Sequence, residues 1–161
     1  MAADIVTDVE RLRKELDRLR AEGKTIVLAN GNFDLWHVGH TRYLQGAATE
    51  GDVLVVALNS DESIRATKGP DRPIHPLTER MEVVAGMGGV DYVTSFDTST
   101  CDALLEALRP HKQAKGPDYT PENLPERATL RRIGAALVIV GDPKDHSSSE
   151  ILERLRARSS P

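Results

Sequence analysis

The apolar run 53–58, Val-Leu-Val-Val-Ala-Leu, constrains the fold of this chain more than any other stretch. Continuous runs of this kind are typical of parallel strands that are covered on both faces of a sheet. The segments 25–29 and 136–140 are also short and apolar, and 90–96 predicts a further strand. We therefore expect a mostly parallel sheet.

Helical patterns separate these strands. In 4–22, apolar residues recur at helical spacing between charged ones. The other segments in which we expect helices are 39–50, 61–66, 77–88, 100–108 and 147–158. Strands that alternate with helices of about ten residues imply βαβ units. The predicted fold is therefore α/β, a Rossmann-like parallel sheet with helices on both faces, in three layers (α/β/α).

The segment 110–128 fits this alternation least, because 111–115 is polar throughout where a strand is due. We expect an edge strand or a loop there, and a loop over the Gly- and Pro-rich residues 68–76. The chain shows no internal repeat, low-complexity tract or linker. We expect one domain over 1–161, with an N-terminal helix 4–22 and a core over 25–158.

Composition narrows the partners and the compartment. The formal net charge of −4 argues against nucleic acid or an anionic membrane, which both require a basic face. No run approaches the length of a membrane span, and the charged first twenty residues lack the apolar core of a signal peptide. Cys101 is the only cysteine and reads as a helix-start residue, so we expect a cytoplasmic protein without a disulfide.

The segment 31–40, Gly-Asn-Phe-Asp-Leu-Trp-His-Val-Gly-His, lies where a predicted strand ends and a predicted helix begins. Such a junction presents free backbone N–H groups and the positive end of the helix dipole, which attract phosphate. Imidazole donors from His37 and His40 would hold the phosphates of a nucleotide there. The two histidines would otherwise serve as a cap and a core hydrogen bond, or bind a metal, for which no further ligands cluster nearby. Gly39 between them and the strand before them favour phosphate binding.

Together with three further motifs, this segment resembles the HxGH nucleotidyltransferase superfamily, in its cytidylyltransferase-like branch. Residues 68–74 resemble the Lys-Gly-x-x-Arg-Pro loop of that branch, and 59–61 follow the second strand as they do there. Residues 115–119 resemble its Lys-Gly-Gly-Asp-Tyr turn, with Pro117 in place of a glycine. Residues 147–151 loosely resemble its Ser-Thr-Thr-x-x-Ile helix start. The chain is most similar to the family of D-glycero-β-D-manno-heptose 1-phosphate adenylyltransferases.

The resemblance implies transfer of the AMP part of ATP to that sugar phosphate, giving ADP-heptose and pyrophosphate, with Mg²⁺ accompanying ATP. A homodimer is also expected, but only from this resemblance. No general base is needed, because the attacking phosphate oxygen is already an anion. The implied catalytic residues are His37, His40, Lys68 and Arg80; the nucleotide-binding residues are Gly31, Asn32, Phe33, Gly39, Lys115, Asp118, Ser147 and Ser148; the substrate-binding residues are Asp34, Arg72 and Tyr119; and no residue is expected to bind a metal.

Several of these residues also have ordinary structural roles. Asp34 is suited to bracing its loop, because a carboxylate beside a triphosphate is repulsive without a metal. A surface ion pair accounts for Arg80, and solvated charge for Lys68 and Arg72. Ser147 matches a capping box with the glutamate three residues on, while the same helix start offers donors to phosphate, with Ser148 the expected contact.

Two other functions stay open. One is a related transferase that uses CTP with glycerol 3-phosphate or phosphoethanolamine, or ATP with a flavin or pantetheine phosphate. The other is a nucleotide-binding module without catalysis, for which the atypical segment 111–119 is the only support.

Overall fold

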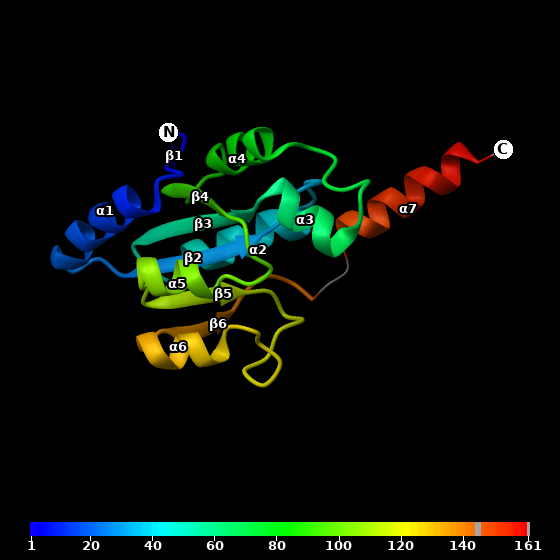
Figure 1. The fold of residues 1–161 in the computed structure, drawn as a ribbon. Coiled ribbons are helices and arrows are strands. Elements are labelled where there is room, and N and C mark those ends of the chain that lie inside the picture. Colours follow the sequence, from blue (N-terminus) through cyan, green and yellow to red (C-terminus); the bar gives the residue numbers. More distant parts are fainter. Residues whose placement is uncertain (144–145, 161) are drawn as a thin grey trace.

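The computed structural model describes residues 1–143 and 146–160, and these build one six-stranded sheet with helices on both faces (Figure 1). The strands are β1 (Asp4–Ile5), β2 (Ile26–Gly31), β3 (Val53–Asn59), β4 (Tyr92–Phe96), β5 (Lys112–Lys115) and β6 (Ala136–Ile139). Their order is β1-β4-β3-β2-β5-β6, and every neighbouring pair is parallel. The predicted three-layer α/β fold is confirmed.

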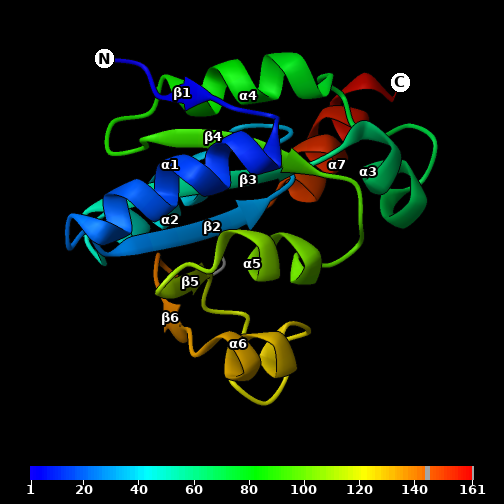
Figure 2. The ribbon, with the colours of Figure 1, turned by 60° about the vertical axis from the view of Figure 1, so that its left-hand side comes forward.

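Helices cover the two faces unequally. The helices are α1 (Val9–Ala21), α2 (Val38–Ala48), α3 (Asp61–Lys68), α4 (Leu77–Ala85), α5 (Asp102–Leu108), α6 (Arg127–Ile133) and α7 (Ser148–Ser159). On one face lie α1, α5 and α6, and on the other lie α2 and α4 (Figure 2). The last helix, α7, projects away from the body of the molecule (Figure 1). Across the described ranges, no helix combines the length and the apolar character that spanning a bilayer requires.

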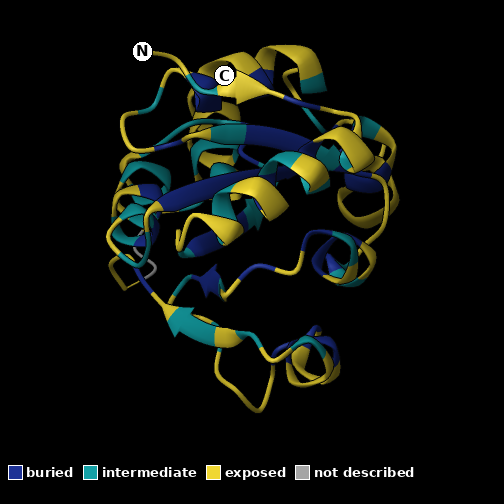
Figure 3. Cartoon of the chain, turned by 90° about the vertical axis from the view of Figure 1, so that its left-hand side faces the viewer, coloured by how far each residue is buried: buried dark blue, intermediate teal, exposed yellow. Residues whose placement is uncertain are grey.

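The core consists of two apolar layers separated by the sheet. Leu12 of α1 and Leu105 of α5 are fully buried on one face, and Leu44 of α2 and Val84 of α4 on the other. The central strands are dark blue in Figure 3, which marks them as buried, while the outer surfaces of the helices are exposed. The continuous apolar run of β3 therefore has the double-sided burial that its sequence predicts.

The predicted N-terminal helix 4–22 is wrong at its start. Asp4 and Ile5 form β1 beside β4, and the Val6 N–H continues this contact by donating to the Val93 carbonyl at 2.8 Å. The helix begins only at Val9, because the Asp8 carboxylate accepts from the Arg11 N–H and caps it. The spacing of Val6 fits a helix, but hydrogen bonds to the backbone of β4 stabilise residues 4–6 as extended chain.

The prediction of an edge strand or loop over 110–115 is also wrong. Residues 112–115 form β5, which lies inside the sheet between β2 and β6. Two of its polar side chains have partners across the fold: Lys112 Nζ donates to the Glu50 carbonyl at 2.8 Å, and Gln113 Nε2 donates to Asn30 Oδ1 at 3.1 Å. Gln113 Oε1 is buried, and no described residue donates a hydrogen bond to it. Interior strands are usually apolar, but polar residues can occupy one when their side chains form hydrogen bonds.

Candidate active site

A pocket of about 520 Å³ lies at the carboxyl ends of β2 and β5, where the strand order reverses. Parallel sheets bind ligands at such a switch point. Among the residues predicted for the site, those that line this pocket are Gly31, Asn32, Phe33, His37, Gly39, His40, Lys68, Arg72, Lys115, Asp118, Tyr119, Ser147 and Ser148. Asp34 and Arg80 are not among the described residues that line it.

The two imidazoles form a stacked pair at the start of α2. Their ring centroids lie 3.8 Å apart. His37 is the N-cap of α2, and its Nδ1 accepts from the Gly39 N–H at 3.1 Å. His40 Nδ1 accepts in turn from the His37 N–H at 3.3 Å. His37 and His40 therefore cap the helix start and line the pocket at the same time.

These hydrogen bonds fix where the protons of the pair lie. Because each Nδ1 accepts, each neutral ring carries its hydrogen on Nε2. Burial, with a smaller effect of His37, lowers the pKa of His40 to about 4. Burial and then the charge of His146 lower the pKa of His37, against the attraction of Glu150. At neutral pH both rings are thus uncharged Nε2–H donors beside the pocket that they line.

Gly39 is required by the packing of this pair. A Cβ added there would lie 2.8 Å from both Cε1 and Nδ1 of His37, a distance that forces the imidazole to move. The same Cβ would lie 3.7 Å from the Cβ of His146, which also lines the pocket. Glycine thus lets the imidazole lie directly over the helix start.

Phe33 supports the pair by packing against His40. It is 3% exposed and has a φ of +49°, a conformation that is strained for a bulky side chain. Its ring lies 5.3 Å from that of His40 and stacks with Trp36 and Tyr43 at centroid distances of 6.0 and 6.3 Å. The Trp36 ring lies 5.2 Å from that of His40, so Phe33 and Trp36 both pack around this imidazole.

Asp34 braces two loops instead of lining the pocket. Arg72 Nε donates to Asp34 Oδ2 at 2.9 Å, and the N–H groups of Ile74 and His75 also donate to this carboxylate. Burial on its own raises the pKa of Asp34, but these donors outweigh burial and lower it. The structure thus favours the bracing role of Asp34 over the predicted substrate contact, while Arg72 reaches the pocket.

Arg80 is likewise a positioning residue in this structure, neither a surface ion pair nor a pocket residue. Its side chain is 1% exposed. The guanidinium donates to the carbonyls of Asn32, Asn59 and His75 at 2.8 to 3.0 Å, and to Asp61 Oδ1 at 2.7 Å. It ties α4 to the ends of β2 and β3, and the direct phosphate contact stays an untested prediction.

The two lysines of the site differ in environment. Lys68, at the end of α3, is exposed at the pocket edge, and no ion pair links it to another described residue. Lys115, at the end of β5, is 5% exposed and lies 4.7 Å from the ring centroid of Tyr119. Lys68 is therefore free to meet a phosphate, whereas Lys115 is already held by its neighbours.

The start of α7 supports one of the two predicted roles of its serines. Ser147 Oγ accepts from the Glu150 N–H at 3.0 Å and is the N-cap. Ser148 Oγ donates to the Leu35 carbonyl at 3.0 Å, which ties α7 to the loop after β2. Ser148 also lines the pocket, so its expected contact with phosphate stays a prediction.

The pocket residues missed from the sequence include three with titratable side chains, Glu126, Asp142 and His146. His146 directly precedes the N-cap of α7, and its ring lies 6.2 Å from that of His37. Glu126 comes from the segment between β5 and α6 and is 2% exposed. A histidine next to a serine-rich helix start was a usable signal for His146, but no local pattern marks Glu126.

The donor set bears on the expected Mg²⁺. Within the ranges 1–143 and 146–160, no three His, Cys, Asp or Glu side chains are grouped so that they could hold a metal. Mg²⁺ usually keeps several waters and binds through substrate phosphates with one or two carboxylates. The described residues show no metal cage of their own, and Mg²⁺ as the companion of ATP stays a prediction.

Comparison with known proteins agrees with this geometry. Residues 28–154 match the family model described as cytidylyltransferase-like. "Bifunctional protein HldE" from Desulfatibacillum aliphaticivorans is 40% identical over 148 residues, which cover 92% of this chain and 30% of the relative. The protein of the same name from Pelobacter propionicus is 44% identical over 141 residues, covering 88% and 29%. The chain thus spans less than a third of the length of these relatives.

A solved structure shows the same fold. The lipopolysaccharide core biosynthesis protein from Thermoplasma volcanium GSS1 superposes with a TM-score of 0.64 at 24% identity, over 76% of this chain and 100% of that one.

The parallel sheet, the pocket at its switch point and the two imidazoles fit the class of protein that this family model describes. The family model covers most of the chain, so the chain belongs to the cytidylyltransferase-like family.

Proposed function

We propose that this chain transfers the AMP part of ATP to a sugar phosphate, most closely D-glycero-β-D-manno-heptose 1-phosphate, giving ADP-heptose and pyrophosphate. The pair of neutral imidazoles at the start of α2 carries the proposal, because it supplies two fixed Nε2–H donors to a nucleotide in the pocket. The match of residues 28–154 to the cytidylyltransferase-like family model supports it. The name of the relatives, a bifunctional protein, is compatible with a chain that matches less than a third of their length.

The reaction needs positioning more than acid–base chemistry. An anionic oxygen of the sugar phosphate attacks the α-phosphorus of ATP, and the bond from that phosphorus to the β-phosphate oxygen breaks. Negative charge grows on the α-phosphoryl oxygens and on the leaving pyrophosphate. His37 and His40 donate to these oxygens from positions already fixed by the helix start, and the exposed ammonium of Lys68 adds positive charge.

Magnesium takes part as Mg·ATP. The ion shares the charge of the phosphates when bound. At the start of α7, the backbone N–H groups of residues 148–149, which line the same pocket, would donate to phosphate oxygens.

Pyrophosphate release tests the proposal. The purified chain is incubated with ATP or CTP and, in turn, the heptose 1-phosphate, glycerol 3-phosphate, phosphoethanolamine, flavin mononucleotide and pantetheine phosphate. Turnover with ATP and the heptose phosphate is the expected result. Turnover only with CTP contradicts the choice of nucleotide, and ATP binding without pyrophosphate for any acceptor indicates a module without catalysis.

A further inference from the structure

The carboxylate of Glu126 is only half satisfied at the pocket wall. Oε1 accepts from the Cys101 N–H at 3.1 Å and helps to start α5. Oε2 is buried, and no described residue donates a hydrogen bond to it. Lys115 Nζ lies 3.6 Å away, close enough for charge attraction but too far for a hydrogen bond. A buried carboxylate oxygen without a donor is costly, which marks it as a place for a ligand group.

The surroundings restrict what that group is. A second cation is disfavoured, because the Lys115 ammonium already lies beside Oε2. A phosphate is disfavoured, because two anions would meet in a place shielded from water. A neutral donor remains, and a hydroxyl is the donor that a sugar supplies.

The position of Glu126 points to the acceptor. Glu126 lies at the start of α6, on the sheet face covered by α1, α5 and α6, whereas His37 and His40 start α2 on the other face. In phosphoryl transfer the attacking and leaving groups lie roughly in line on opposite sides of the phosphorus. With the imidazoles on the phosphates that leave, the attacking sugar phosphate lies toward Glu126. This placement gives the Glu126 side of Lys115 to the acceptor, whereas the family resemblance gives Lys115 to the nucleotide.

We propose that Oε2 of Glu126 accepts a hydrogen bond from a hydroxyl of the sugar phosphate acceptor, and that this contact selects polyhydroxylated acceptors. This inference rests on the proposed function and adds a residue that reads the sugar. A site built to bind a hydroxyl discriminates strongly against an analogue that lacks it, because its own acceptor is then left unpaired.

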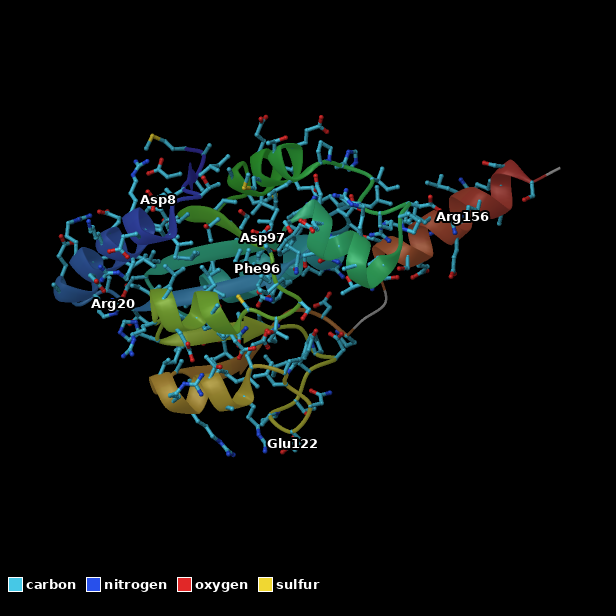
Figure 4. The ribbon with its side chains drawn as sticks, in the orientation of Figure 1. Asp8, Arg20, Phe96, Asp97, Glu122 and Arg156 are labelled. Atoms are coloured by element: carbon cyan, nitrogen blue, oxygen red, sulfur yellow. The ribbon has the colours of Figure 1, made fainter. Side chains whose placement is uncertain are left out.

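The test compares Glu126→Gln with Glu122→Gln. In the first variant the amide oxygen can still accept from the Cys101 N–H, but the amide nitrogen in place of Oε2 cannot accept from a hydroxyl. Glu122 lies in the same segment and points into solvent, so its variant is the matched control (Figure 4). We expect Glu126→Gln to raise the KM for the heptose 1-phosphate about tenfold or more, with little change in the KM for ATP. Glu122→Gln should match the wild type, and thermal unfolding shows that both variants are folded.

Deoxy analogues separate the acceptor from the ribose of ATP. The wild type should lose about tenfold in kcat/KM with one deoxy form of the sugar phosphate, and Glu126→Gln should show almost no further loss with that form. If Glu126→Gln instead shows no further loss with 2′-deoxy-ATP or 3′-deoxy-ATP, Glu126 binds a ribose hydroxyl of ATP and the inference is overturned.

The wild type separates the two levels of proposal. A wild type that turns over while Glu126→Gln keeps an unchanged acceptor KM overturns the inference alone. A wild type that binds no sugar phosphate by calorimetry, with or without an ATP analogue, overturns the proposed function and this inference with it.

Discussion

Arg72 donates from Nε to Asp34 Oδ2 at 2.9 Å, and this contact joins the loop after β2 to the loop before α4. The Asp34 carboxylate is fully buried, and the Arg72 side chain is almost so. The same carboxylate accepts from two backbone N–H groups of residues 74–75. The loop that carries Arg72 to the pocket is therefore held by a residue of the histidine motif itself.

Replacing Asp34 with asparagine should lower the free energy of unfolding by about 3 kcal/mol, because the variant leaves the guanidinium of Arg72 buried without its counter-charge. Chemical denaturation measures the loss. Asp71→Asn, at an exposed position of the same loop, is the control and should change little. Equal stability of the two variants would show that the Asp34–Arg72 contact is not what holds this loop.

Gly39→Ala should lower kcat by about tenfold or more while leaving a folded protein. The added methyl group meets the His37 ring at 2.8 Å, so the imidazole must leave its place over the helix start. Gly88→Ala is a suitable control, because a Cβ there meets no atom within 4 Å. Steady-state pyrophosphate release gives the comparison, and equal kcat values for both variants would contradict the steric argument.

His40→Ala should lower kcat about a hundredfold or more, because it removes a donor to charge that develops in the transition state. The variant should lose some stability as well, since the ring packs on Phe33 and Trp36 and accepts from the His37 N–H. Circular dichroism checks the fold. His75→Ala serves as the control, because that imidazole lies outside the pocket lining and is half exposed. A kcat for His40→Ala within about threefold of the wild type removes His40 from the mechanism.

The stability of the protein should fall with acidification between pH 6.5 and about 4. Burial, and to a smaller degree His37, lower the pKa of His40 from 6.5 to about 4. In this window the unfolded chain binds a proton at His40 that the folded chain does not bind. Acidification therefore lowers the free energy of unfolding. We expect His40 to account for about 1–3 kcal/mol of this loss. Denaturation curves at several pH values should be flatter for His40→Gln, and parallel curves would contradict the assignment.

The sequence could predict the features that depend on local chemistry. The run of β3 identifies a buried parallel strand because its residues 53–58 are all apolar. The histidine motif identifies the strand-to-helix junction because glycine and imidazole at that spacing suit one geometry. The capping of α7 by Ser147 follows from the same kind of short-range rule.

Features that depend on distant partners could not be predicted. Arg80 is a buried tie because carbonyls 21 and 48 residues away converge on it. β5 lies inside the sheet although it is polar, because Gln113 donates a hydrogen bond to Asn30 and Lys112 donates one to Glu50, both far away in the sequence. Glu126 lies in a segment without periodicity, and only the three-dimensional structure brings its carboxylate to Lys115.

The pocket takes its imidazoles from the α2 side of the sheet and its buried carboxylate from the α5–α6 side. Displacement along a line between those sides inverts the configuration at phosphorus. If one stereoisomer of an α-thiotriphosphate is the substrate, the α-phosphorus of the product should therefore have the inverted configuration.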